Sequence, residues 1–247
     1  MDTTSGWRRI TQMGRAELTL LVALVLVLGG LWSLAVLTDE VMEGETTSLD
    51  ERILLAMRNP QDLADPIGPS WVEEVGRDFT ALGGGSVLAF LTLSVVGYLL
   101  LQRRAAIAGL VIVAVVGGSL LGLLFKAEFN RPRPSLVPHA MYVYNSSFPS
   151  GHSMSSAATY LTLGALLART QARRVLKLYF LSLALLLTLL VGVSRVYLGV
   201  HWPTDVLAGW TAGALWALLC WLVARWLQQR GQVEPTPPEV IHELVIS

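Results

Sequence analysis

The sequence predicts an all-α, polytopic membrane protein with six transmembrane helices and a short amphipathic helical segment outside the membrane. The first supporting observation is composition. Of the 247 residues, 53% are hydrophobic and only 15% are charged, which is too apolar for an ordinary soluble domain. The second is patterning, because the apolar residues are gathered into long runs. Six runs are long enough, or nearly so, to cross a hydrocarbon core that takes about 20 helical residues.

The six predicted spans are residues 18–37, 85–101, 105–125, 151–168, 175–193 and 206–227. The first run has a second interpretation as a secretory signal peptide, because Arg8, Arg9 and Arg15 precede it and the small residues Ser33 and Ala35 lie near its end. The run is longer than the usual apolar core of a signal peptide. We therefore expect it to be a retained membrane helix.

The basic residues predict the orientation. With the N-terminus in the cytoplasm, 11 of the 18 lysines and arginines fall on the cytoplasmic side. The segment 39–78, which is then outside, carries eleven acidic residues against three arginines. Since cytoplasmic loops carry an excess of Lys and Arg, this distribution places both termini in the cytoplasm.

We expect three parts along the chain: a cytoplasmic arm at 1–17, the six-helix membrane domain at 18–227, and a flexible cytoplasmic tail at 228–247. Within the membrane domain, residues 38–84 form an extracytoplasmic insertion, and the polar motifs lie within 126–205.

The insertion contains a short pattern typical of an amphipathic helix. Leu49, Ile53 and Met57 recur four residues apart, which would place them on one helical face. Such a helix either rests on the bilayer surface or forms a lid over a site, and amphipathicity alone does not separate the two.

Composition also excludes several classes of function. The formal net charge is zero and no basic stripe is interleaved with aromatic residues, so nucleic-acid binding is not expected. Cys220 is the single cysteine, so one chain cannot form a disulfide or a thiolate cluster. We expect no metal and no cofactor, because only His201 and Asp205 have a spacing that suits ligands. The oligomeric state is not predicted.

Three polar segments follow or open the predicted spans, and the predicted orientation puts all three on the outer face. They are Lys126-x6-Arg133-Pro134, Pro149-Ser150-Gly151-His152 and Ser194-Arg195-x5-His201-x3-Asp205. Together they hold three cations, two histidines and a carboxylate. This set suits phosphoryl transfer through a phosphohistidine without a metal.

The three cations would bind a phosphate in different ways. Lys126 supplies a point charge, whereas Arg133 and Arg195 can each grip two oxygens with a planar fork. Ser150 and Gly151 stand at a helix start, where backbone N–H groups and the helix dipole favour an anion. We therefore expect these five residues to bind phosphate.

The two histidines differ in their surroundings. His201 and Asp205 are four residues apart, so a helical turn beginning near Pro203 would let the carboxylate hold one imidazole N–H. The other nitrogen would then be free to attack phosphorus. His152 lies on a different predicted helix and is the expected acid for the leaving oxygen and base for water.

The sequence leaves the roles of three further residues open. Arg131 contacts phosphate, faces lipid headgroups or pairs with Glu128. His139 is interpreted as a loop residue with no obvious partner, and Ser194 either bonds phosphate or caps the turn.

The three segments resemble the tripartite signature of the type 2 phosphatidic acid phosphatase superfamily at every signature position. With six spans, the layout is similar to that of bacterial membrane lipid phosphatases. The resemblance implies a bacterial plasma-membrane enzyme with His201 as nucleophile, Asp205 as its orienting carboxylate and His152 as acid and base. It also implies that Lys126, Arg133, Ser150, Gly151 and Arg195 hold phosphate.

The expected function is metal-independent hydrolysis of a lipid phosphate or pyrophosphate at the outer membrane face. Undecaprenyl pyrophosphate, phosphatidylglycerol phosphate and phosphatidic acid are the candidate substrates, and the sequence does not choose among them. Transfer of phosphate to an acceptor lipid is the first alternative. A vanadate-dependent oxidase, which the resemblance also includes, and a non-enzymatic scaffold or transporter are less favoured.

Overall fold

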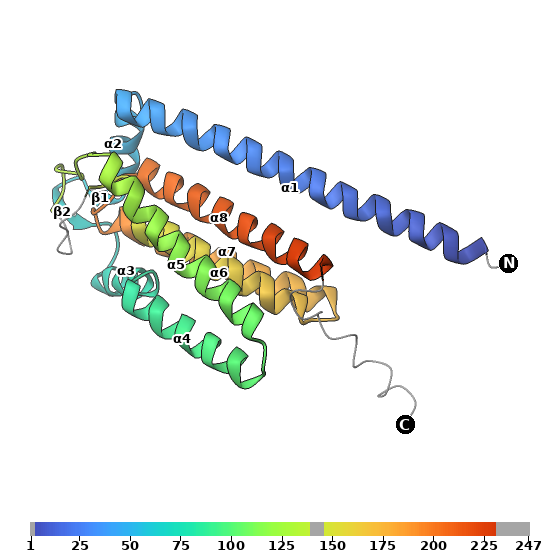
Figure 1. Cartoon of the computed structure of the whole chain (residues 1–247). Helices are drawn as coiled ribbons and strands as arrows, with labels where there is room; N and C mark the ends of the chain where they lie inside the picture. The colour runs from blue at the N-terminus through green and yellow to red at the C-terminus, as the bar shows by residue number, and fades with distance from the viewer. Residues whose placement is uncertain (1–2, 139–145, 231–247) are drawn as a thin grey trace.

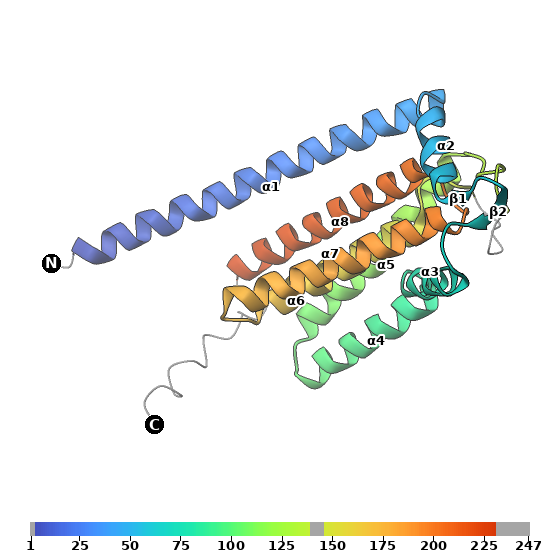
Figure 2. The same cartoon turned by 180° about the vertical axis from the view of Figure 1, so that it is seen from behind.

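The computed structural model of the chain describes residues 3–138 and 146–230, so His139 and the tail beyond residue 230 lie outside the described residues. Six long helices run lengthwise beside one another (Figures 1 and 2). They are α1 (Thr3–Glu43), α4 (Gly85–Leu101), α5 (Ala105–Glu128), α6 (Gly151–Arg169), α7 (Arg174–Tyr197) and α8 (Pro203–Gln229).

The segment between α1 and α4 forms a cap at one end of the bundle. It contains α2 (Thr47–Ala56), the antiparallel pair β1 (Arg58–Asn59) and β2 (Asp62–Pro66), and α3 (Ser70–Leu82). The N-terminus lies at the opposite end of α1 (Figure 1).

Four helices are long and apolar enough to cross a membrane by themselves. They are Glu17–Glu43 of α1, α5, α7 and Pro203–Gln228 of α8, and a fifth candidate is the pair α3 and α4, which is bent by 50°. The predicted count of six is therefore not confirmed. The remaining helix, α6, is only 19 residues long and carries several serines and threonines. It packs against α5, α7 and α8 in the middle of the bundle, so much of its surface faces protein.

The helices α5, α7 and α8 are longer than the apolar runs that predicted them. Lys126 lies in the last turn of α5, Arg195 in the last turn of α7, and Asp205 in the first turn of α8. Lys126, Arg195 and Asp205 thus sit on helical ends, just beyond the apolar runs that predicted these helices. The fourth motif-bearing helix, α6, begins at Gly151, as the sequence predicted.

The amphipathic helix predicted near Leu49 exists as α2. Leu49 is 54% exposed and Ile53 is 36% exposed, whereas Asp50 and Leu54 are fully buried. The predicted apolar face is therefore not the face that packs on the protein, where Asp50 is held by ionic and hydrogen-bond partners. The next helix, α3, packs on α7, with Thr80 buried between them.

Glycines allow α8 to approach α6 closely. A Cβ on Gly209 would lie 2.6 Å from the backbone oxygen of Ser150, and one on Gly213 would lie 2.4 Å from that of Met154. Small residues at such crossings let helix backbones come together in membranes. This contact fixes the start of α6 against the first half of α8, which is where two of the three polar motifs lie.

Candidate active site

The three polar motifs meet at the capped end of the bundle. They occupy the last turn of α5 with the residues that follow it to Pro134, the start of α6, and the connection from α7 to α8, which all lie near α2 and the β1–β2 pair (Figures 1 and 2). The motifs converge because of the chain direction, since α5 and α7 end at this side of the bundle and α6 and α8 begin there.

Lys126 and Arg133 are brought together by one carbonyl group. Lys126 Nζ donates to the backbone oxygen of Ser146 at 2.7 Å, and Arg133 Nη2 approaches the same oxygen at 3.4 Å. Gly151 adjoins them, because a Cβ there would lie 3.3 Å from Lys126 Cε. The glycine therefore lets the lysine lie against the start of α6.

Ser150 is the N-cap of α6 and is completely buried. Its hydroxyl oxygen accepts from the backbone of Ser153 at 3.5 Å and from the Ser153 hydroxyl at 2.9 Å, while its own N–H donates to the backbone oxygen of Asp205 at 2.9 Å. The Ser150 side chain is thus used to cap the helix. The backbone N–H groups that follow it, at Gly151 and His152, are first-turn donors available to an anion.

Arg195 lies inside the protein, with 3% of its surface exposed. Its Nη1 donates to the Thr80 hydroxyl of α3 at 2.9 Å. His152, one helix away, lies within electrostatic range of Arg195, His201, Lys126 and Arg133. The predicted phosphate-binding and proton-transfer residues therefore lie close enough to interact electrostatically.

The tautomer of His201 follows from its neighbours. Arg133 Nη1 lies 3.2 Å from His201 Nε2 and also donates to the Val200 carbonyl at 2.6 Å. Since a guanidinium only donates, Nε2 must be the accepting, unprotonated nitrogen. The proton of the neutral ring is then on Nδ1, which faces Asp205 Oδ2 at 3.4 Å.

Burial keeps this ring neutral. His201 is 2% exposed, and its removal from water lowers the pKa of the imidazole to about 4, although the neighbouring Asp205 carboxylate acts in the opposite direction. At neutral pH the ring is therefore neutral, with Nε2 unprotonated. Burial also lowers the pKa of Arg133 from its ordinary value, but an arginine remains charged in proteins.

Asp205 is held by several donors besides His201. Its Oδ2 accepts from the backbone N–H of Trp202 at 2.9 Å and from the hydroxyl of Ser147, and its Oδ1 accepts from Arg131 at 2.7 Å. Sequence reasoning missed Ser147, which is fully buried. It lies in no motif and is preceded by another serine, so its residue type gave no signal.

The open interpretations of Arg131 and Ser194 are resolved by their contacts. Arg131 bridges Asp205 and Asp50, at 2.7 Å to each, and does not use Glu128 as its ion-pair partner. Ser194 donates to the Val191 carbonyl within its own helix at 2.7 Å. Asp50 was also missed, since it is one of many acidic residues in the insertion.

An apolar groove of about 700 Å³ lies beside the motif residues. It runs between the second half of α1 and the end of α5, and its lining includes Trp32, Phe125, Phe129, Phe148 and Pro149. Phe148 and Pro149 directly precede Ser150, so the groove adjoins the start of α6. Its lining suits a hydrocarbon chain.

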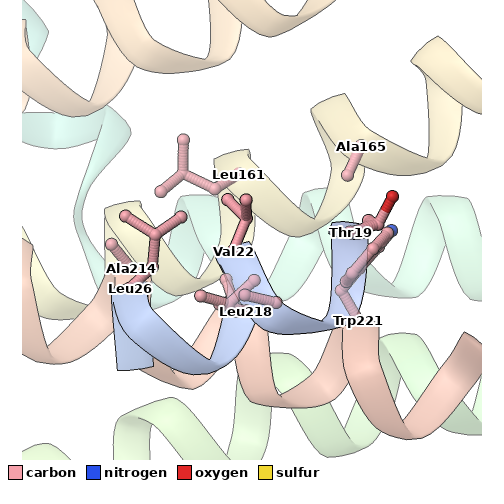
Figure 3. Close-up of a pocket in the computed structure, with 10 residues that line it drawn as sticks. Thr19, Val22, Leu26, Leu161, Ala165, Ala214, Leu218 and Trp221 are labelled. Carbon is pink, nitrogen blue, oxygen red and sulfur yellow. The ribbon is translucent and has the colours of Figure 1, made fainter. Parts of the chain in front are cut away.

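A second apolar pocket, of about 370 Å³, lies elsewhere in the bundle. Figure 3 shows Thr19, Val22 and Leu26 of α1 beside Leu161 and Ala165 of α6 and Ala214, Leu218 and Trp221 of α8. None of the residues that line it belongs to the three motifs, so it is not the candidate active site.

Within residues 3–138 and 146–230, no group of three or more His, Cys, Asp or Glu side chains could hold a metal ion. The charges around the histidines come instead from Lys126, Arg133 and Arg195.

The sequence profile described as "PAP2 superfamily" matches residues 105–229, which is half of the chain and includes all three motifs. The chain belongs to the PAP2 superfamily. The resemblance drawn from the motifs is thereby confirmed, and the chain is a phosphatase of the PAP2 type with membrane helices.

Relatives in this superfamily carry names of lipid phosphatases. Phosphatidylglycerophosphatase B of Bacillus subtilis is 36% identical over 154 residues, covering 59% of this chain and 71% of the relative. Lipid A 1-phosphatase of Rhizobium etli is 28% identical over 185 residues, covering 64% and 75%. Undecaprenyl-diphosphatase of Sulfolobus acidocaldarius is 30% identical over 131 residues, covering 51% and 59%.

A solved PAP2 structure shares the fold. The transmembrane PAP2-type phosphatidylglycerolphosphate phosphatase of Bacillus subtilis superposes with a TM-score of 0.71 at 27% identity, covering 82% of this chain and 98% of that one. The shared fold extends beyond the motif region and supports a multi-pass membrane protein with the PAP2 fold.

Proposed function

We propose that the protein is a metal-independent lipid phosphatase that hydrolyses a phosphate or pyrophosphate ester through a phosphohistidine at His201. The observation that carries this proposal is the pair of groups that the His201 ring nitrogens face, from which we infer its tautomer. Nδ1–H faces Asp205, while Nε2 presents a lone pair beside the Arg133 guanidinium. A phosphate held by that guanidinium would lie next to the nucleophilic nitrogen.

The first chemical step forms an Nε2–phosphorus bond and breaks the bond from phosphorus to the lipid oxygen. Lys126, Arg133 and Arg195 stabilise the charge on the phosphoryl oxygens. The negative charge of the bound phosphate favours protonation of His152, which then donates a proton to the departing lipid oxygen. Asp205 stabilises the positive charge that develops on the His201 ring, because it accepts from Nδ1–H.

The second step returns the enzyme to its starting state. His152, now neutral, takes a proton from water as the water oxygen attacks phosphorus. The phosphorus–nitrogen bond breaks and its electron pair returns to Nε2 of His201. Inorganic phosphate leaves, and both histidines regain their initial protonation.

We infer that the substrate is an amphiphile whose tail stays in the bilayer. The groove between α1 and α5 adjoins the motif residues and is lined by aromatic and aliphatic side chains. The names of the relatives indicate phosphatidylglycerophosphate, undecaprenyl diphosphate and lipid A phosphate as candidates. Phosphatidic acid is a further candidate of the same chemistry.

The proposed topology has six spans, with the bent pair α3 and α4 counted as one and α6 as another. The N-terminus, the C-terminal tail 228–247 and the arm 1–17 are cytoplasmic, so the capped end of the bundle faces the extracytoplasmic side of a bacterial plasma membrane. The distribution of basic and acidic residues supports this orientation.

The direct test is phosphate release by purified protein from a panel of lipid monophosphates and pyrophosphates in detergent, with and without a chelator. We expect release from at least one lipid, unaffected by chelator and inhibited by vanadate. Loss of activity in chelator that magnesium restores would overturn the metal-independent proposal. An acceptor lipid that captures the phosphate in place of water would favour the alternative, a lipid phosphotransferase.

A further inference from the structure

A buried ionic chain connects the insertion to the candidate nucleophile. Asp50 of α2 contacts Arg131 at 2.7 Å, and Arg131 contacts Asp205 at 2.7 Å, which in turn faces His201 Nδ1 at 3.4 Å. Asp50 and Asp205 are both 0% exposed. Charges this deeply buried are stable only when they are paired and hydrogen-bonded.

Arg131 holds the two carboxylates through different nitrogens. Its Nη2 donates to Asp50 Oδ2, while its Nη1 donates to Asp205 Oδ1 and to the Thr204 hydroxyl. The guanidinium also lies over the Trp202 ring, 5.7 Å from its centroid. Because the fork is planar and rigid, the position of one carboxylate constrains the position of the other.

Asp50 also holds the first turn of α8 directly. The backbone N–H of Thr204 donates to Asp50 Oδ1 at 2.9 Å, and the Thr204 hydroxyl donates to Asp50 Oδ2 at 2.6 Å. A carboxylate from another helix therefore caps an N-terminus that Asp205 helps to form. Asp50 therefore stabilises the first turn of α8 in two ways. It accepts a hydrogen bond from an N–H group that has no partner within the helix, and its negative charge interacts favourably with the helix dipole.

These contacts determine how the Asp205 carboxylate is turned. Oδ1 is occupied by Arg131, which leaves Oδ2 for Trp202 N–H, Ser147 and His201 Nδ1. Without Asp50, Arg131 would be free to shift toward Asp205, and the start of α8 would lose its cap. The carboxylate would then no longer be aimed at Nδ1.

We propose that Asp50 is a positioning residue of the phosphatase site, acting through Arg131 and Thr204 to aim Asp205 at His201. The insertion that carries α2 therefore helps to hold the nucleophile in position. This inference rests on the proposed function in so far as His201 is the nucleophile. It assigns a catalytic consequence to a residue that touches neither phosphate nor the reacting atoms.

The first test is kinetic and uses a matched control. We expect Asp50→Asn to lower kcat on the order of 10-fold, the loss typical when a group that orients a reacting ligand is removed. KM should change little, because Lys126, Arg133 and Arg195 remain. Glu45→Gln removes the same charge from an exposed position in the same segment and should leave kcat unchanged. A KM increase with unchanged kcat would overturn the proposal.

A double-mutant cycle separates positioning from general destabilisation. If Asp50 acts through Asp205, the double variant Asp50→Asn/Asp205→Asn should be no slower than Asp205→Asn alone. Independent, multiplicative losses would contradict the proposal. Should Asp50→Asn fail to fold, Arg131→Lys keeps the positive charge but cannot bridge two carboxylates. It should show the same kcat loss and the same coupling to Asp205.

A second readout does not depend on activity. The chain has only four histidines, so ¹⁵N NMR of histidine-labelled protein in detergent can follow the His201 ring. We expect wild-type His201 to be protonated on Nδ1, and Asp50→Asn to give a mixture of tautomers, as Asp205→Asn should. An Asp50→Asn spectrum identical to wild type would overturn the positioning proposal. A wild-type protein that shows the expected tautomer but releases no phosphate from any lipid would overturn only the proposed function.

Discussion

His201 lies between two groups of opposite kind. Its ring is buried, and its two nitrogens face a guanidinium at Nε2 and a carboxylate at Nδ1. A buried neutral imidazole needs a hydrogen-bond donor at one nitrogen and an acceptor at the other. These two neighbours supply both and favour a single tautomer, with Nδ1–H toward Asp205 and the Nε2 lone pair toward Arg133.

Substitutions along this chain should differ in severity. We expect His201→Ala to lower kcat on the order of 10⁴-fold or more, because it removes the attacking atom. Asp205→Asn should be milder, since it disturbs the tautomer and orientation of a nucleophile that is still present. Phosphate release from the best lipid substrate measures both. An Asp205→Asn variant more impaired than His201→Ala would contradict the assigned roles.

The protonation of His201 provides a separate check. Burial disfavours the charged ring, so the pKa of His201 is lowered to about 4 and the imidazole is neutral at neutral pH. In a ¹⁵N NMR titration of the ligand-free protein, we expect its signals to remain those of a neutral ring from neutral pH down to about one pH unit above this pKa. A midpoint near the ordinary histidine value would show that the ring is not desolvated.

At the scale of the elements, the site depends on how closely α8 approaches α6. Gly209 faces the backbone oxygen of Ser150, so a methyl group there has no flexible neighbour to displace. The start of α6, with Ser150 and Gly151, is consequently positioned by the crossing itself. The phosphate-binding segment and the His201–Asp205 pair are parts of one helix–helix contact.

Gly209→Ala should therefore damage both stability and activity. We expect a loss of about 1–3 kcal/mol in the free energy of unfolding, as for overpacking in a dense interior, together with reduced turnover. Gly109→Ala is the matched control, because a Cβ at Gly109 meets nothing within 4 Å. Thermal unfolding in detergent measures the first effect and phosphate release the second. If the two variants had the same unfolding temperature and the same rate of phosphate release, the crossing of α6 and α8 would not be tightly packed.

The sequence was sufficient for the long apolar helices and for membership of the PAP2 superfamily, while the roles of the individual site residues stay predictions. Long apolar runs predicted α1, α5, α7 and α8, because lipid contact requires them. It was insufficient for α2, whose buried face is set by Asp50 and its distant partner Arg131. A contact between residues 81 positions apart leaves no periodic signal. For the same reason, neither Ser147 nor Thr80 was identified.

At the scale of the whole molecule, the proposed orientation places the cap of α2, β1, β2 and α3 outside the cell membrane. The single cysteine, Cys220, can be replaced by serine to give a background without thiols. In intact cells, Ser48→Cys should react with a membrane-impermeant maleimide, whereas Gln171→Cys should react only after permeabilisation. Both positions lie outside the long helices' apolar spans. The reverse pattern would invert the topology.

The central claim is that phosphate passes through His201. Purified protein mixed with a lipid carrying radiolabelled phosphate, and quenched rapidly in alkali, tests it most directly. We expect an acid-labile, alkali-stable phosphoenzyme whose label maps to the peptide containing His201 and is absent from His201→Ala. Label on any other residue, or undiminished hydrolysis by His201→Ala, would contradict the proposed mechanism.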